Sequence, residues 1–210
     1  MARKNRAFLH IGPNPSHLEA LHDELAAHAD LLDTVGLALP PVDAALIELA
    51  GHEMLRDHKA AGLKRKDVEG AWAKVARKAA KTGSDVVISQ PRFHTASDEQ
   101  AELILHALGG FDVHVVITPD DAELDDGAND WANDWANDWA ATLAPAWNRD
   151  LKAGRLLVSP LSDDASGVDL AENLIGLALC AQKRHLDNRI ATLKRRRKDV
   201  RRRLELLDAS

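Results

Sequence analysis

The sequence predicts an α/β protein with a parallel β-sheet, helices on both faces of the sheet, and a long C-terminal helix. Residues 84–89 and 113–118 are apolar runs without alternation, as in strands that are buried on both faces of a parallel sheet. Segments with apolar residues at helical spacing separate these runs. Because strands alternate with helices, the connections are expected to be right-handed crossovers in a three-layer α/β/α arrangement.

The first strand is expected at residues 6–12, which form a short apolar run ending at Gly12. Two prolines then force a turn. Ser16 followed by Glu19 three residues later is a capping-box pattern, which predicts the start of the first helix. Apolar residues at helical spacing extend this helix to about Gly36.

Further elements alternate along the chain. Helices are predicted at residues 44–56, 67–81 and 97–108, and a fourth strand is predicted at residues 155–159.

The C-terminal segment predicts one continuous helix. Residues 170–207 contain no proline and a single glycine, and apolar residues recur every seven positions. Two charged residues, Lys183 and Arg197, interrupt the core slots of this heptad pattern. The apolar core positions are Leu179, Leu186, Ile190, Leu193, Val200, Leu204 and Leu207. We therefore expect an α/β domain at residues 1–166 and a basic helix at residues 167–210.

Composition places the chain in a reducing compartment. The 210 residues are 45% hydrophobic and 29% charged, as in globular proteins. Cys180 is the single cysteine, so no intrachain disulfide can form, and a cytoplasmic location is predicted. No apolar stretch approaches the roughly 20 residues that span a bilayer, and the apolar run near the N-terminus is too short for a signal peptide.

Charge is divided sharply between two segments. Residues 182–205 hold eleven Lys/Arg against three Asp/Glu, whereas residues 120–138 hold eight Asp/Glu and no basic residue. This asymmetry suggests that the two segments meet each other or meet separate partners.

Residues 128–140 contain Asn-Asp-Trp-Ala three times in tandem. In a helix, a period of four places Trp131, Trp135 and Trp139 in a slowly drifting stripe. The favoured interpretation is a duplication in an exposed helix whose Trp stripe packs on the domain. An aromatic ligand-binding platform is the alternative.

A strand, a glycine and the start of a helix form the usual layout of a phosphate site, because backbone N–H groups there attract anions. A working loop also needs further glycines and a Lys with Ser/Thr. The loop here offers Gly12, Pro15, Ser16 and His17, with no Lys and no second glycine. Prolines remove two N–H donors.

The residues Phe8-Leu-His-Ile-Gly12, together with the later Gly36 and Pro40, resemble the opening of the actinobacterial branch of the P-loop sulfotransferases. The resemblance extends over roughly residues 6–160. It implies a P-loop sulfotransferase-like fold and, for intact members, transfer of a sulfuryl group from 3′-phosphoadenosine 5′-phosphosulfate (PAPS).

This chain departs from the family pattern where the chemistry needs residues. The family's P-loop Lys falls on Pro15, and its following glycine falls on His17. The arginine expected after the third long strand, which helps to bind the donor's 3′-phosphate, falls on Asp120, and an expected glutamate falls on Pro91. We therefore expect a degenerate member that lacks the PAPS-binding residues, with no cofactor.

Other chemistry finds little support. The ten histidines form no H-x3-H pair or Cys/His cluster, so no metal site is predicted. Ser89 and Cys180 have no evident base and orienting partner in the sequence, so no catalytic residue is predicted.

The strongest sign of an interaction surface is the C-terminal basic run, which follows three apolar residues of the heptad pattern. We therefore predict a non-catalytic protein that acts in binding or assembly, as a homodimer or with a protein partner through this helix. The alternatives are a sulfotransferase with an altered loop and a polyanion-binding protein. The predicted interaction residues are Leu186, Ile190, Leu193, Lys194, Arg195, Arg196, Arg197, Lys198, Arg201, Arg202 and Arg203.

Overall fold

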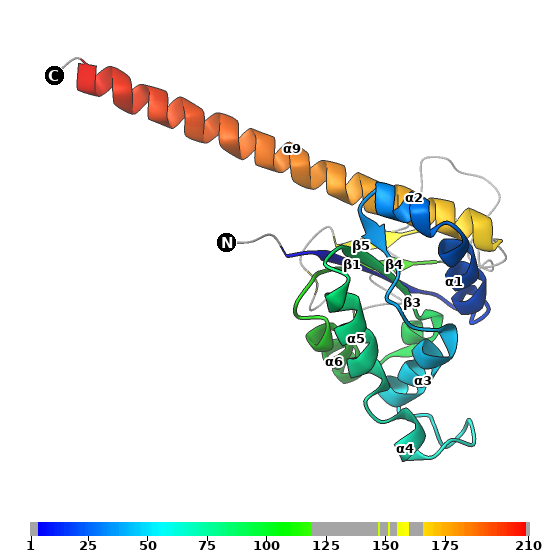
Figure 1. The fold of residues 1–210 in the computed structure, drawn as a ribbon. Helices are drawn as coiled ribbons and strands as arrows, with labels where there is room; N and C mark the ends of the chain where they lie inside the picture. The colour runs from blue at the N-terminus through cyan, green and yellow to red at the C-terminus, as the bar shows by residue number, and fades with distance from the viewer. Residues whose placement is uncertain (1–3, 119–146, 148–150, 152–154, 160–165, 209–210) are drawn as a thin grey trace, which may run out of the picture. The chain divides into compact units, whose positions relative to one another are not determined.

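A computed structural model gives the fold of the chain (Figure 1). It describes residues 4–118, 147, 151, 155–159 and 166–208. The chain divides into two compact units, Met1–Leu174 and Ile175–Ser210. The tandem Trp repeat at residues 128–140 and Asp120 lie outside the described residues, so their predicted roles stay predictions.

The first unit is built on a five-stranded sheet in which every pair of neighbouring strands is parallel, with the order β2-β3-β1-β4-β5. The predicted α/β class and parallel sheet are confirmed. β1 is the central strand, and its Leu9 lies opposite Ile88 on one side and Val115 on the other. The strands are β1 Arg6–Ile11, β2 Leu37–Ala38, β3 Asp85–Ser89, β4 Asp112–Ile117 and β5 Leu156–Val158.

One face of the sheet carries the main hydrophobic core. Alternate residues of a strand point to the same face, and Leu9, Ile88 and Val115 pack there with Trp72 and Ile104 from the covering helices. Figure 1 shows these helices grouped against this face. They are α3 Ala44–Leu55, α5 Ala71–Lys81 and α6 Asp98–Ala107.

The opposite face carries the residues between these. Phe8, Val87 and Val116 are fully buried there, and Figure 1 shows α1 (His17–Ala27) and α2 (Ala29–Thr34) on this side of the sheet. Both faces are therefore covered, which explains why the strands are apolar without alternation.

Side-chain caps explain the starts of two of the predicted helices. Asp43 accepts a hydrogen bond from Leu46 N at 2.8 Å and starts α3. Ser97 and Gln100 form a capping box at the start of α6. These are side-chain oxygens that satisfy N–H groups left over in a first helical turn.

Two predicted helices are shorter than expected. The helix predicted to extend to Gly36 breaks at His28, whose backbone leaves the helical region between α1 and α2. The helix predicted at residues 67–81 is divided by Gly70, which has a φ of 80°. It becomes a short α4 (Arg65–Val68) and α5. Strand β2 and the 3₁₀ helix η1 (Pro91–Thr95) were not predicted from the sequence.

The long C-terminal helix is confirmed as α9, which extends over 42 residues from Gly167 to Asp208. At 1.5 Å per residue this is about 63 Å. Its first residues, to Leu174, belong to the first unit, where Leu170 and Leu174 are fully buried. The remainder forms the second unit.

Gly51 in α3 faces the buried side chain of Gln90, so α3 and the end of β3 approach closely. The Gln90 Nε2 donates to Ile47 O at 2.6 Å, and a Cβ at position 51 would lie 2.6 Å from this Nε2. The pairing of Gly51 with Gln90 therefore sets how closely α3 packs on the sheet.

We expect Gly51→Ala to lower the free energy of unfolding by about 1–3 kcal/mol, because the added methyl displaces a buried hydrogen-bonded side chain. In a Gln90→Ala background the same change should raise it by up to about 1 kcal/mol, because alanine is the better helix former. Urea denaturation of the four proteins measures both values. Gly110→Ala, where no atom lies within 4 Å of the new Cβ, is the control, and equal losses in both backgrounds would contradict the assignment.

Candidate functional site

The carboxyl ends of β1, β3 and β4 form the place where a ligand site is expected. In open parallel sheets ligands bind at this edge, where the connections that leave two adjacent strands lead to opposite sides of the sheet. β3 and β4 flank β1 here, and three polar residues lie near the ends of these strands. They are His10, Ser89 and Thr118, which are all buried.

The imidazole of His10 joins the three strands. Its Nδ1 lies 2.9 Å from Ser89 Oγ, and its Nε2 lies 2.7 Å from Thr118 Oγ1. Each hydroxyl can donate or accept, so a neutral imidazole is fully satisfied between them. Complete burial, with a smaller contribution from the nearby His17, lowers the pKa of His10 to about 3. His10 is therefore neutral in the folded protein across the physiological range.

This cluster brings Ser89 into hydrogen-bonding distance of a histidine, which the sequence analysis did not foresee. The pair still lacks the features of a nucleophilic site. Ser89 is 5% exposed, and the second neighbour of His10 is the hydroxyl of Thr118 instead of a carboxylate. The three side chains therefore act as a hydrogen-bonded link between the ends of β1, β3 and β4.

Four backbone N–H groups in the loop after β1 and at the start of α1 donate hydrogen bonds to oxygens of the protein itself. Gly12 N bonds to Pro91 O at 3.0 Å and Ser16 N bonds to Asn14 Oδ1 at 3.0 Å. The amides that open α1 also find backbone acceptors: His17 N bonds to Asn14 O and Leu18 N to Pro15 O. Because two prolines in this loop carry no N–H, few donors face outward for an anion.

The capping box predicted at Ser16 and Glu19 is wrong. Ser16 precedes α1, but its side chain makes no capping bond to the helix. Its hydroxyl donates instead to Asn14 Oδ1 at 2.6 Å. The amide side chain of Asn14 thus takes both donors of Ser16, which closes the turn locally.

The four loop residues singled out in the sequence lie in this one turn, with different surroundings. Gly12 is buried against Thr118, and a Cβ at position 12 would lie 3.1 Å from Thr118 Cβ. Pro15 and Ser16 are exposed, and His17 is buried with its ring 5.9 Å from that of His10. Pro15 is therefore a surface proline, and the imidazole of His17 is buried.

A second polar cluster lies between α3 and η1. His52 Nδ1 is 2.7 Å from Asp57 Oδ1, and Arg92 forms an ion pair with the same carboxylate. Here Asp57 neutralises Arg92 and fixes the ring of His52. The cluster joins the end of α3 to η1.

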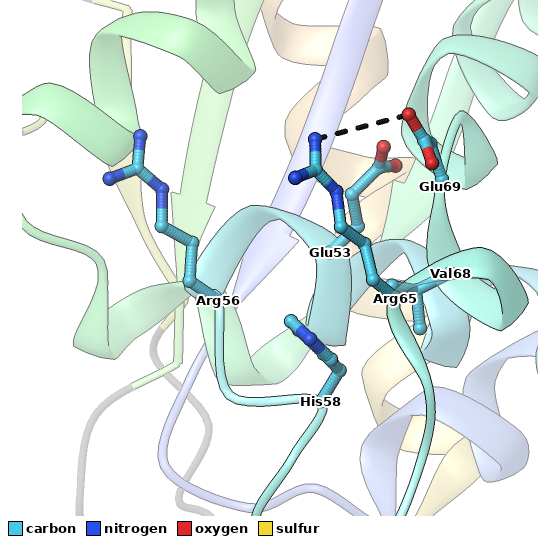
Figure 2. Close-up of a pocket in the computed structure, with 6 residues that line it drawn as sticks. All are labelled: Glu53, Arg56, His58, Arg65, Val68 and Glu69. Carbon is cyan, nitrogen blue, oxygen red and sulfur yellow. Dashed lines mark ion pairs between the residues drawn. The ribbon is translucent and has the colours of Figure 1, made fainter.

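A pocket of about 470 Å³ lies near α3 and α4 (Figure 2). The carboxylate of Glu53 accepts from Gly70 N at 2.6 Å and from Trp72 N at 2.8 Å, so it is a structural acceptor for the start of α5. Figure 2 marks the ion pair of Arg65 with Glu69, at 3.9 Å. The pocket is lined by Glu53, Arg56, His58, Arg65, Val68 and Glu69. Two arginines balance two glutamates, so it offers no strong net attraction for a polyanion.

Metal and membrane sites find no support in the described part of the chain. No group of three or more His, Cys, Asp or Glu side chains there could hold a metal ion. Nor does any described helix combine the length and the apolar character needed to cross a bilayer.

The predicted interaction residues all lie on α9. Leu186, Ile190 and Leu193 are about half exposed. The basic residues that follow are exposed as far as Arg202, while the side chain of Arg203 lies outside the described part. The first unit thus holds a buried strand-end cluster in which both ring nitrogens of His10 have hydrogen-bond partners. The second unit holds a helix with exposed apolar and basic residues.

Comparison of the chain with models of protein families and with curated proteins found no match.

The buried His10 predicts a specific pH dependence of stability. An unfolded histidine has a pKa near 6.5, whereas that of folded His10 is about 3, so between these values only the unfolded state binds the proton. The free energy of unfolding must therefore fall as pH is lowered through this window, by about 1 kcal/mol per unit between about pH 6 and about pH 5 from His10 alone. Above the unfolded pKa this contribution is constant.

We expect His10→Gln to lose this part of the slope, whatever its absolute stability, because glutamine does not titrate. Denaturant midpoints at several pH values measure it. The exposed His106→Gln is the matched control and should keep the wild-type slope. An unchanged slope in His10→Gln would show that His10 is protonated in the folded protein.

Proposed function

We propose that this protein is a degenerate, non-catalytic member of the sulfotransferase-like proteins, which acts in binding or assembly through its C-terminal helix. The observation that carries the first half of this proposal is the internal use of the loop's backbone donors at Gly12, Ser16, His17 and Leu18. A phosphate-binding loop directs such donors at its ligand. Here an anion would have to displace bonds that already exist.

The absence of cations at the positions expected for donor binding also supports this proposal. The sulfuryl donor is a polyanion, so binding depends on cations placed at its phosphates. Pro15 stands where the resemblance expects a lysine, and Asp120 stands where it expects an arginine. His10 supplies no positive charge either, because burial keeps it neutral.

The glutamate position supports the same proposal. It holds Pro91, whose carbonyl accepts the Gly12 amide and closes the loop. Proline has no ionisable side chain that could replace the carboxylate in proton transfer. Two of the positions that the resemblance singles out, Pro15 and Pro91, therefore hold residues whose carbonyls accept backbone hydrogen bonds from Leu18 and Gly12.

The second half of the proposal rests on α9. A helix with many like charges gains little from local propensity and is stabilised mainly by packing of an apolar face. Leu186, Ile190 and Leu193 remain 49–59% exposed. A covering partner, either a second copy or another protein, would bury this face. The single cysteine agrees with such a role in the cytoplasm.

We predict no measurable binding of 3′-phosphoadenosine 5′-phosphate, the nucleotide product of the donor, near neutral pH. Isothermal titration calorimetry at moderate salt is the measurement. The variant Pro15→Lys supplies the missing cation and one new backbone N–H at an exposed position. We expect it still not to bind the nucleotide, because the amides of Gly12, Ser16, His17 and Leu18 remain bonded within the protein. Micromolar affinity of the unmodified protein would favour instead a sulfotransferase with an altered loop.

A further inference from the structure

The exposed apolar seam of α9 has a regular composition. We define the seam as Leu179, Leu186, Ile190, Leu193 and Val200, whose side chains are between 38% and 59% exposed. The spacing places leucine and valine at d positions and Ile190 at an a position of a heptad repeat. Such a stripe along a helix fits the apolar stripe of another helix.

The positions beside the seam carry one sign of charge. In a coiled coil the e and g residues border the core and decide which helices pair. From residue 189 onward the described e and g positions are all cationic: Arg189, Lys194, Arg196 and Arg201. The core slot between them holds Arg197, which is also exposed.

These charges disfavour a second copy of the chain. A parallel pair sets Arg189 against Lys194 of the second copy, and Arg196 against Arg201. It also places two Arg197 side chains in the core, and like charges at such positions repel. An antiparallel pair in which Ile190 faces Leu193 sets Arg189 against Arg196. It also buries Arg197 against an apolar side chain.

The composition of the seam also disfavours nucleic acid. A phosphate backbone would match the arginines, but it would leave five apolar side chains in water. The basic run holds no aromatic residue on which a base could stack. An apolar seam bordered by cations fits best a surface that is apolar in the centre and anionic at the edges.

We propose that α9 binds an acidic amphipathic helix of a different protein, with apolar residues at its core positions and Asp or Glu at its e and g positions. This inference rests on the proposed assembly function and specifies its partner. Carboxylates at the partner's edges pair with Arg189, Lys194, Arg196 and Arg201. One further carboxylate opposite Arg197 compensates the charge at the core slot.

The test uses the full-length protein and two synthetic peptides of about four heptads, both with Leu and Ile at core positions. One peptide has Glu at every e and g position, and the other has Lys there. We expect the Glu peptide to bind at least about 10-fold more tightly than the Lys peptide in fluorescence anisotropy, and its affinity to fall as salt is raised.

Two charge-matched variants locate the contact. Arg189→Glu/Arg196→Glu reverses charges beside the seam and should shift the preference toward the Lys peptide. Arg195→Glu/Arg202→Glu makes the same change of net charge on the outer face of the helix and should retain the preference for the Glu peptide. Equal effects of the two variants, or equal binding of the two peptides, would overturn the inference.

Failure of this inference is distinguishable from failure of the proposed function. Sedimentation of the full-length protein and of Leu186→Asp reports self-association through the seam. A dimer that Leu186→Asp disrupts, without binding of the Glu peptide, would refute the acidic partner and keep the assembly function. A monomer that binds neither peptide but binds duplex DNA would refute both.

Discussion

The neutral imidazole of His10 joins the three central strands of the sheet at their carboxyl ends. Because it lies between Ser89 and Thr118, each ring nitrogen has a hydroxyl partner, and neither needs water or a ligand. Protonation would place an uncompensated charge in a buried position, which explains the lowered pKa. His10 therefore has no ring nitrogen left for a ligand at the edge where parallel sheets usually bind one.

The loop that follows β1 also satisfies its polar groups within the protein. Its amides at Gly12 and Ser16 bond to Pro91 O and Asn14 Oδ1, so the turn holds its shape without an anion. The α9 helix shows the opposite condition, since its seam residues are exposed and bordered by cations. The polar groups at this end of the sheet are therefore satisfied internally, whereas the exposed apolar residues lie on α9.

Sequence reasoning recovered what depends on local pattern. Continuous apolar runs marked the buried strands, and the helix predicted to begin at residue 97 is α6, which starts after the cap residue Ser97. It failed where a single residue competes with periodicity, as at the left-handed Gly70, which divides a predicted helix. It also failed at Ser16, because the side chain of Asn14 offered a nearer partner than the helix. The His10 cluster was not foreseen, because Ser89 and Thr118 lie 79 and 108 residues from His10 and meet it only once the strand order is known.

The amides of Gly12, Ser16, His17 and Leu18 already bond within the protein, and one measurement tests directly whether they are closed to a phosphate. In a titration of the ¹⁵N-labelled protein with inorganic pyrophosphate, the amide resonances of Gly12, Ser16, His17 and Leu18 report on the donors themselves. We predict that these resonances stay unshifted up to millimolar ligand, because each amide already bonds to a protein oxygen. Saturable shifts confined to these four amides would show that the loop opens to bind anions, and would contradict this prediction.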